Sequence, residues 1–130
     1  MPKGLKKIGI LGGMGPEATA DLFRWIIWLT PATNDQENVP VVIHNNPQIP
    51  SRVEAIMNNG PSPLPVMRKM VKELETLNCN FVSIPCNAAH YYLPDLNKNS
   101  NIPIINMIEK TADYINENFP NIKKVGILAP

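Results

Sequence analysis

Ile8-Gly9-Ile10-Leu11-Gly12-Gly13, followed shortly by Pro16, is the stretch that decides the fold of this chain. The continuous apolar run predicts a strand buried on both faces, and the glycines predict a tight turn directly after it. Because proline fits the first turn of a helix, a helix is expected from Pro16 to about Thr30. A buried strand that turns at once into a helix is typical of an α/β domain with a parallel sheet.

The rest of the chain repeats this alternation of strand and helix. Further apolar runs predict strands at residues 39–43, 81–85, 102–105 and 125–128. Helical spacing of apolar residues predicts helices at residues 51–57, 64–77, 90–97 and 107–118. The predicted fold is α/β, a parallel sheet with helices on both faces.

The charge balance and apolar content exclude several classes of protein. The 130 residues carry 12 Lys+Arg against 11 Asp+Glu, a net charge of +1, so no nucleic-acid partner is expected. No stretch approaches the ~20 apolar residues of a membrane span, so no membrane partner is expected. Because no apolar run precedes the first strand, we expect no signal peptide, and we expect a cytoplasmic protein with reduced thiols at Cys79 and Cys86.

A short sequence repeat bears on domain organisation. Lys6-Lys7-Ile8-Gly9-Ile10-Leu11 returns near the end as Lys123-Lys124-Val125-Gly126-Ile127-Leu128. One interpretation is a fifth strand of the same sheet, and the other is the first strand of a second lobe. The division expected here is an α/β lobe over residues 1–102 and the truncated start of a second α/β lobe over residues 103–130.

The first loop after a strand carries a glycine motif. In a parallel sheet, ligands bind beyond the carboxyl ends of the strands. Gly13-Met14-Gly15-Pro16-Glu17-Ala18 matches the dinucleotide pattern G-x-G-x-x-A, but the second strand ends in His44-Asn45-Asn46 and lacks the acidic residue that would hold a ribose. Either the glycines let backbone N–H groups hold a smaller anion beside a flexible Met14, or they only make the turn.

The third strand is bracketed by the two cysteines. Seven residues at ~3.3 Å each separate them by roughly 23 Å, too far for a disulfide, and Cys79 is expected to be a buried structural residue. Cys86 precedes a helix, where a reactive thiolate is favoured. Asn87, Ala88 and Ala89 follow and supply backbone N–H donors.

Three polar residues are candidates to assist Cys86. With His90 it would form a nucleophile–base pair of a thiol hydrolase or amidase, or a proton-transfer pair, and a purely structural cysteine is the remaining interpretation. One cysteine and one histidine make no metal-ligand set, so no metal site is expected. Arg52 suits bidentate capture of a carboxylate, or is a solvated residue at a helix start. Asn45, at the end of the second strand, is a possible supporting residue.

Taken together, four blocks of sequence resemble the aspartate/glutamate racemase family, the cofactor-independent amino-acid racemases. The blocks are Ile8-Gly9-Ile10-Leu11-Gly12-Gly13-Met14-Gly15-Pro16-Glu17-Ala18-Thr19, Asn45-Asn46-Pro47-Gln48-Ile49-Pro50-Ser51-Arg52, Pro85-Cys86-Asn87-Ala88-Ala89-His90 and Pro103-Ile104-Ile105-Asn106-Met107-Ile108. The resemblance implies a two-lobed α/β isomerase that acts on acidic amino acids without pyridoxal phosphate or any other cofactor. Two cysteines on opposite faces of the substrate exchange its α-proton in that family.

The resemblance assigns roles to residues of this chain. Cys86 matches the catalytic thiol of the N-terminal lobe, and Arg52 matches the arginine that holds a substrate carboxylate. Asn87 and the Ala88–Ala89 backbone match the segment that holds the α-carboxylate, and Met14 matches the wall of the glycine turn.

Two departures from the family pattern limit what is expected of the chain. Ala88 stands where the family has Thr or Ser, and a hydrogen bond lost from a charged group costs roughly 1.5–3 kcal/mol. The family is also nearly twice as long, and its second cysteine lies in the second lobe. We therefore expect no racemisation by this chain alone, and exposed apolar surface near its end that is covered by self-association or by a missing C-terminal lobe. A non-catalytic lobe that binds a carboxylate or a partner is the alternative.

Overall fold

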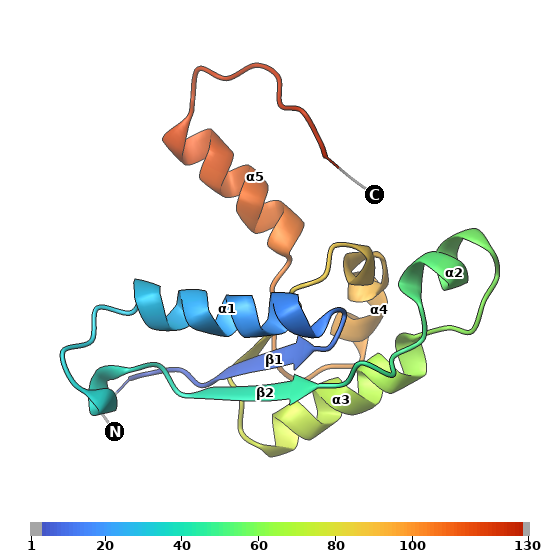
Figure 1. The fold of residues 1–130 in the computed structure, drawn as a ribbon, viewed down its shortest axis with the longest axis horizontal. Helices are drawn as coiled ribbons and strands as arrows, with labels where there is room; N and C mark the ends of the chain where they lie inside the picture. Colours follow the sequence, from blue (N-terminus) through green and yellow to red (C-terminus); the bar gives the residue numbers. More distant parts are fainter. Residues whose placement is uncertain (1–3, 129–130) are drawn as a thin grey trace.

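A parallel sheet lies at the centre of the computed structural model, which describes residues 4–128. Its order is β2-β1-β3, with β1 (Ile8–Gly12) between β2 (Val41–Asn45) and β3 (Phe81–Ser83) (Figure 1). Ile10 of β1 lies in register with Ile43 and Ser83 of its neighbours. The carboxyl ends of all three strands therefore meet at one edge.

Helices cover both faces of this sheet, as the sequence predicts. One face carries α1 (Pro16–Leu29), and the other carries α3 (Leu64–Thr76) with α4 (Leu93–Lys98) packed against it (Figure 1). The carboxyl edge of the sheet is bordered by α2 (Arg52–Met57) and by a 3-10 segment, Ala88–Tyr92. A second 3-10 segment, Asp35–Glu37, interrupts the loop before β2.

The hydrophobic core is on the α3 side of the sheet. Methionine, leucine and valine side chains of α3 pack there against β1, β3 and α4, and the buried members include Leu11, Met67, Met70, Val71, Leu74, Val82, Ile84, Leu93 and Leu96. On the opposite side, Thr19 is the only buried residue of α1. The two faces are therefore unequal, since the α1 face has no comparable core.

The predicted fourth and fifth strands are corrected by the structure. Residues 102–105 form only an isolated parallel bridge, in which the Val82 N–H donates to Pro103 O at 2.9 Å and the Ile105 N–H donates to Val82 O at 2.8 Å. Proline has no N–H to continue this ladder. Residues 125–128 form no strand within the described chain, because no neighbouring strand lies beside them, and they are exposed.

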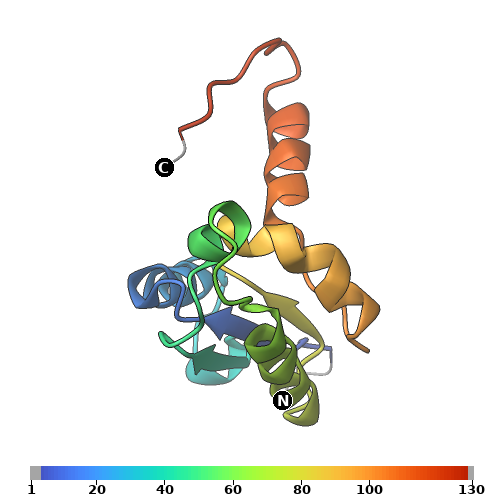
Figure 2. The ribbon, with the colours of Figure 1, turned by 90° about the vertical axis from the view of Figure 1, so that its right-hand side faces the viewer.

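The last helix, α5 (Met107–Asn118), stands clear of the sheet and its helices with the tail after it, as Figures 1 and 2 both show. Helical spacing predicts that Ile108, Ala112 and Ile115 face inward from this helix. Ile108 and Ala112 are exposed and Ile115 is only half-buried, so this prediction is wrong. The expected exposure of apolar side chains near the end of the chain is confirmed, at Ile127 and Leu128 among others.

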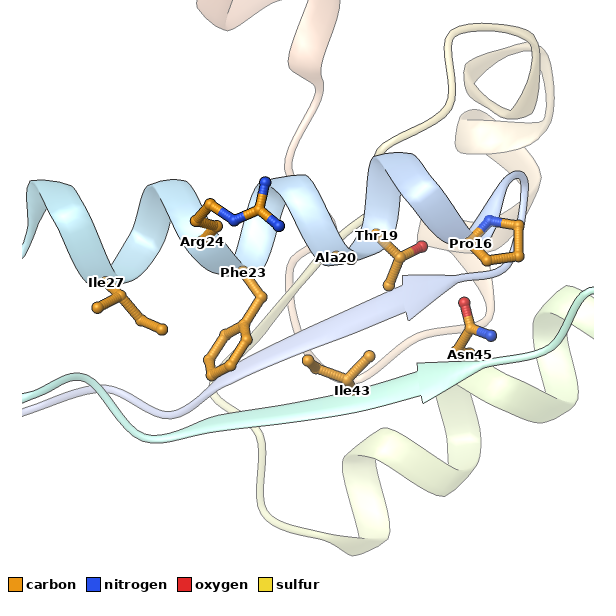
Figure 3. A pocket seen from close by; sticks show the side chains of 8 residues that line it. All are labelled: Pro16, Thr19, Ala20, Phe23, Arg24, Ile27, Ile43 and Asn45. Carbon is orange, nitrogen blue, oxygen red and sulfur yellow. The ribbon is translucent and has the colours of Figure 1, made fainter.

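The face under α1 is open on the β2 side of the helix. A hollow of about 540 Å³ lies between α1 and β2, lined by Phe23, Ile27 and Ile43 among others (Figure 3). Ile43 keeps two fifths of its surface exposed there. One helix is therefore too narrow to cover this side of the sheet.

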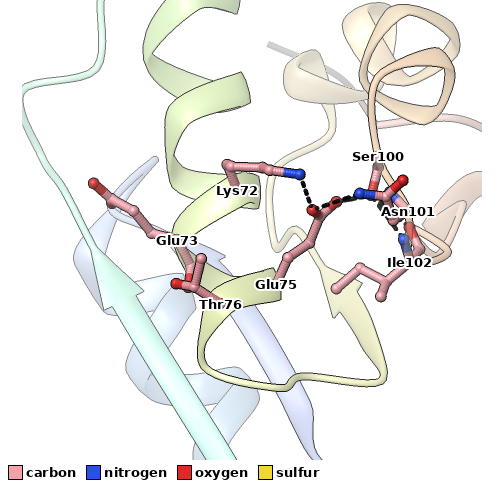
Figure 4. Close-up of polar contacts among 7 residues, drawn as sticks. All are labelled: Lys72, Glu73, Glu75, Thr76, Ser100, Asn101 and Ile102. Carbon is pink, nitrogen blue, oxygen red and sulfur yellow. Dashed lines mark hydrogen bonds and ion pairs between the residues drawn. The ribbon is translucent and has the colours of Figure 1, made fainter.

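A half-buried carboxylate fixes the opposite side. Glu75 of α3 accepts hydrogen bonds from Lys72, from Ser100 and from both the N–H and the side chain of Asn101, at 2.7–3.1 Å (Figure 4). Burial alone raises the pKa of Glu75, but these hydrogen bonds outweigh it and lower the pKa to about 2. Glu75 thus ties α3 to the turn that leads into Ile104.

Candidate functional site

Packing requires Gly12 and Gly13 at the turn after β1, whereas a Cβ on Gly15 would meet open space. Gly13 has a φ of +103°, and a Cβ there would lie 2.3 Å from the backbone carbonyl of Asn46. The buried Thr19 hydroxyl accepts the Gly13 N–H at 3.0 Å and donates to Gly15 O at 3.1 Å. The Gly13 N–H is therefore used within the protein, which favours the interpretation that Gly13 serves the turn. Met14 is buried and joins the core.

The two thiols have opposite surroundings. Cys79 is 3% exposed at the amino end of β3, and burial raises the pKa of its thiol while the charge of Lys7 partly offsets the rise. Cys86 is half-buried just beyond the carboxyl end of β3, where its N–H donates to Ile84 O at 2.8 Å in a tight turn. Of the two, Cys86 is the thiol that lies at the ligand-binding edge of the sheet.

His90 connects two backbone segments and is not the base of a Cys–His pair. Its Nδ1 donates to Cys86 O at 2.8 Å, and its Nε2 accepts the Met107 N–H at 3.1 Å. Both ring nitrogens of this buried side chain are therefore committed to the backbone. The thiol hydrolase or amidase interpretation, which needs an imidazole nitrogen for the Cys86 thiol, is corrected on this ground.

The segment after Cys86 offers backbone donors at its start. Asn87 is exposed and Ala88 is half-buried, and their N–H groups donate to no acceptor within residues 4–128. Ala89 is 0% exposed and packs in the core, so its side chain supports the segment from beneath. Asn87 O accepts the His90 N–H at 3.0 Å, which fixes the turn.

Arg52 begins α2, which Ser51 caps by accepting the Glu54 N–H. Its Nη1 donates to Ile49 O at 3.3 Å and to Pro50 O at 3.1 Å, which holds the guanidinium in place. Its buried Nε has no hydrogen-bond partner in the described part of the chain. A guanidinium anchored at one nitrogen, with a donor left over, is suited to an anion.

The structure brings Arg52 to the segment that follows Cys86. Helix α2 contacts the 3-10 segment Ala88–Tyr92. Burial raises the pKa of Tyr92, Tyr91 adds to the rise, and the positive charge of Arg52 opposes it. Asn45 instead lines the hollow beside α1.

Two contributors to this region were missed at the level of sequence. Thr19 directly follows the quoted glycine motif, and its place in the first helical turn was the available signal. Nothing in the sequence marked Tyr92. Among residues 4–128, no three His, Cys, Asp or Glu side chains are grouped to hold a metal ion. No helix in that range is both long and apolar enough to cross a bilayer.

Comparisons with known proteins agree on one family. The sequence profile described as Asp/Glu/Hydantoin racemase matches residues 11–130. The broad specificity amino-acid racemase RacX of Bacillus subtilis (strain 168) is 29% identical over 112 residues, which cover 83% of this chain and 48% of RacX.

Solved structures agree with that match. The aspartate racemase of Picrophilus torridus superposes with a TM-score of 0.79 at 34% identity, over 88% of this chain and 48% of that one. An aspartate racemase homologue from Pyrococcus horikoshii OT3 shares the fold, with a TM-score of 0.72 at 20% identity over 88% and 50% of the two chains. The chain thus spans about half the length of the relatives it matches.

Proposed function

We propose an activity from one premise, that this chain belongs to the Asp/Glu/Hydantoin racemase family. Its family and relatives support an isomerase activity. The proposal is that residues 4–102 form the N-terminal half-site of an acidic-amino-acid racemase that works without pyridoxal phosphate. On this view α5 and the tail after it begin the second lobe.

One observation carries the proposal. The half-buried thiol of Cys86 lies at the carboxyl edge of the sheet, just before the 3-10 segment that helix α2 with its Arg52 contacts, whereas Cys79 is buried at the other edge. Inversion at an α-carbon needs a base on one face and an acid on the other. This half-site offers one thiol at that edge, and so one face of the substrate.

The chemistry follows from that arrangement. The Cys86 thiolate takes the α-proton, and its sulfur becomes a thiol, while the electron pair of the broken C–H bond stays with the substrate. Arg52 and the N–H groups of Asn87 and Ala88 hold carboxylates during this step. A proton delivered from the opposite face, by a thiol outside this half-site, completes the inversion.

A binding titration tests the proposal. L-aspartate is added to the ¹⁵N-labelled chain, and amide shifts are expected at Arg52, Asn87 and Ala88, with weaker shifts for L-asparagine. Arg52→Met is expected to raise the dissociation constant at least about tenfold, because hydrogen bonds to a charged group are lost.

Arg68→Met is the matched control for this titration. It removes a surface guanidinium that pairs with Asp95 on another part of the chain, at 2.6 Å, and is expected to leave binding unchanged. Shifts confined to other segments, or equal effects of the two variants, would overturn the proposal.

One alternative remains open, a lobe that binds a carboxylate without doing chemistry. Alanine at position 88, where the family has a hydroxyl, favours it. It predicts the same binding but no exchange of the α-hydrogen with solvent.

A further inference from the structure

The two ring nitrogens of His90 are bonded to backbone atoms from separate parts of the chain. Nε2 lies 3.1 Å from the Met107 nitrogen, and Nδ1 lies 2.8 Å from Cys86 O. Because Nε2 accepts the Met107 N–H, the proton of the neutral ring is on Nδ1, which donates to Cys86 O. The side chain is only 7% exposed, so water competes little for either bond. His90 is therefore held in a single tautomer by its two partners.

The carbonyl that His90 holds belongs to the same peptide group as the Asn87 N–H. This peptide is trans, so its C=O and its N–H point in opposite directions. The bond that fixes Cys86 O therefore turns the Asn87 N–H away from His90. Asn87 is exposed, and its N–H donates to no acceptor in the described part of the chain. A fixed and unused donor is thus left at the carboxyl edge of the sheet.

The other bond of His90 reaches the first residue of α5. The Asn106 side chain accepts the N–H groups of Ile108 and Glu109, and His90 accepts that of Met107, which satisfies the first three donors of the helix. Beyond its start, α5 stands clear of the sheet and its helices (Figure 2). Among the side-chain hydrogen bonds of the described residues, the bond to His90 alone ties α5 to the rest of the domain.

These bonds form one chain in which every donor points the same way. Met107 N–H donates to His90, His90 donates to Cys86 O, and the peptide group of that carbonyl ends in the Asn87 N–H. Hydrogen bonds in series polarise one another in a buried setting. The chain also starts at the N-terminus of a 12-residue helix, the positive end of its macrodipole. Both effects make the Asn87 N–H a stronger donor to an anion.

We propose, building on the proposed function, that His90 is a positioning residue for the substrate carboxylate. It aims the Asn87 N–H at that carboxylate through the Cys86–Asn87 peptide, and it connects this N–H to the start of α5. His90 itself does not touch the substrate. Because the second lobe begins at α5 on the proposed function, a shift of that lobe is felt at the carboxylate through His90.

Two substitutions separate the two bonds of His90. Asparagine places an amide N–H near the position of Nδ1 and keeps the bond to Cys86 O. Glutamine places an amide oxygen near the position of Nε2 and keeps the bond to Met107. The two variants therefore differ in which end of the hydrogen-bond chain they break.

Binding and amide exchange are expected to respond in opposite order. His90→Gln is expected to raise the dissociation constant for L-aspartate at least about tenfold, and His90→Asn only about threefold, because in the latter the peptide stays fixed. Exchange of the Met107 amide hydrogen with heavy water is expected to accelerate at least about tenfold in His90→Asn and little in His90→Gln. A merely structural histidine predicts that binding follows the thermal stability of the variants. Equal losses of binding in the two variants, or a larger loss in His90→Asn, would overturn the proposal.

The other histidine of the chain supplies the matched control. His44 lies at the end of β2 and pairs with Glu73 of α3 at 3.2 Å. His44→Gln is expected to leave both aspartate binding and Met107 exchange unchanged. Circular dichroism confirms that each variant folds. A loss of binding in His44→Gln as large as that in His90→Gln would overturn the specific role of His90.

The unmodified protein gives a measurement that needs no variant. In the ¹⁵N-labelled chain, a scalar coupling across the hydrogen bond between the Met107 nitrogen and His90 Nε2 is expected. On addition of L-aspartate, the His90 Nδ1–H resonance is expected to move downfield together with the Asn87 amide. A shift at Asn87 with no change at His90 would overturn this inference and leave the proposed function standing. No shift at Asn87, Ala88 or Arg52 would overturn the proposed function itself, and this inference with it.

Discussion

Cys79 and Cys86 bracket the same strand, and only their positions along it separate their roles. At the amino end, Cys79 packs against Leu74 and Gly9, where a Cβ on the glycine would lie 3.2 Å from the sulfur. At the carboxyl end, Cys86 keeps part of its surface open. A parallel sheet presents its loops for binding at that end, so one thiol serves the core and the other faces the site.

The residue after Asn87 offers a direct prediction. Ala88→Thr restores a hydroxyl beside the N–H donors of this segment, and is expected to lower the dissociation constant for aspartate at least about tenfold. Ala88→Val, which has the shape of threonine without the hydroxyl, is the control, and calorimetry measures both. Equal affinities for the two variants would contradict a carboxylate site at this segment.

The role of His90 is decided by its hydrogen bonds and not by its spacing from Cys86. From spacing alone it is a plausible base for Cys86, one helical turn away. In the structure it joins Cys86 O to the Met107 N–H, so it fixes the end of β3 against the start of α5. Such a role depends on contacts distant in sequence, which no local pattern encodes.

At the scale of elements, the predicted strands and helices hold where their neighbours are present. The runs at 8–11, 39–43 and 81–85 are strands within a residue or two, because each is flanked by another strand in the sheet. The run at 125–128 has the same composition as β1 and no strand beside it, so it stays extended and exposed. An apolar composition predicts a strand, but a strand forms only where a neighbouring strand supplies hydrogen-bond partners.

The candidate site was predictable in part for the same reason. Parallel strands place Arg52 and Cys86 at one edge whatever the details of the loops. What the sequence did not reveal is that Ala89 turns into the core, that Asn45 faces α1, or that Trp25 and Trp28 stay exposed. These outcomes depend on the orientation of each element relative to the sheet.

Glu75 makes the attachment of α3 dependent on pH. Its pKa is about 2 in the folded protein against 4.5 ordinarily, so the stabilisation it provides is present above pH 4.5 and is lost as the pH falls toward 2. Glu75→Gln is therefore expected to lower the free energy of unfolding at pH 7 by on the order of 2–3 kcal/mol.

Urea unfolding measured at a series of pH values tests this prediction. The difference between wild type and Glu75→Gln is expected to shrink progressively between pH 4.5 and pH 2. Glu109→Gln, an exposed change in α5, is the control and is expected to have no such effect. A difference that stays constant with pH would show that the charge of Glu75 does not stabilise the fold.

At the scale of the whole molecule, one side of the chain packs into a hydrophobic core, and two other regions leave apolar side chains exposed. The α3 side carries the core, while the α1 face and α5 with its tail expose apolar surface. The chain spans about half the length of its relatives. If a second lobe begins at α5, the rest of that lobe would cover the apolar surface exposed there.

The central claim is that Cys86 moves the α-proton of an acidic amino acid. We would measure deuterium entering L-aspartate and L-glutamate at the α-carbon in heavy water, by ¹H NMR, for the wild-type chain, Cys86→Ser and Cys79→Ser. The account predicts slow incorporation with retention of configuration in wild type and Cys79→Ser, and none in Cys86→Ser. Incorporation unchanged in Cys86→Ser, or absent from all three proteins, would contradict it.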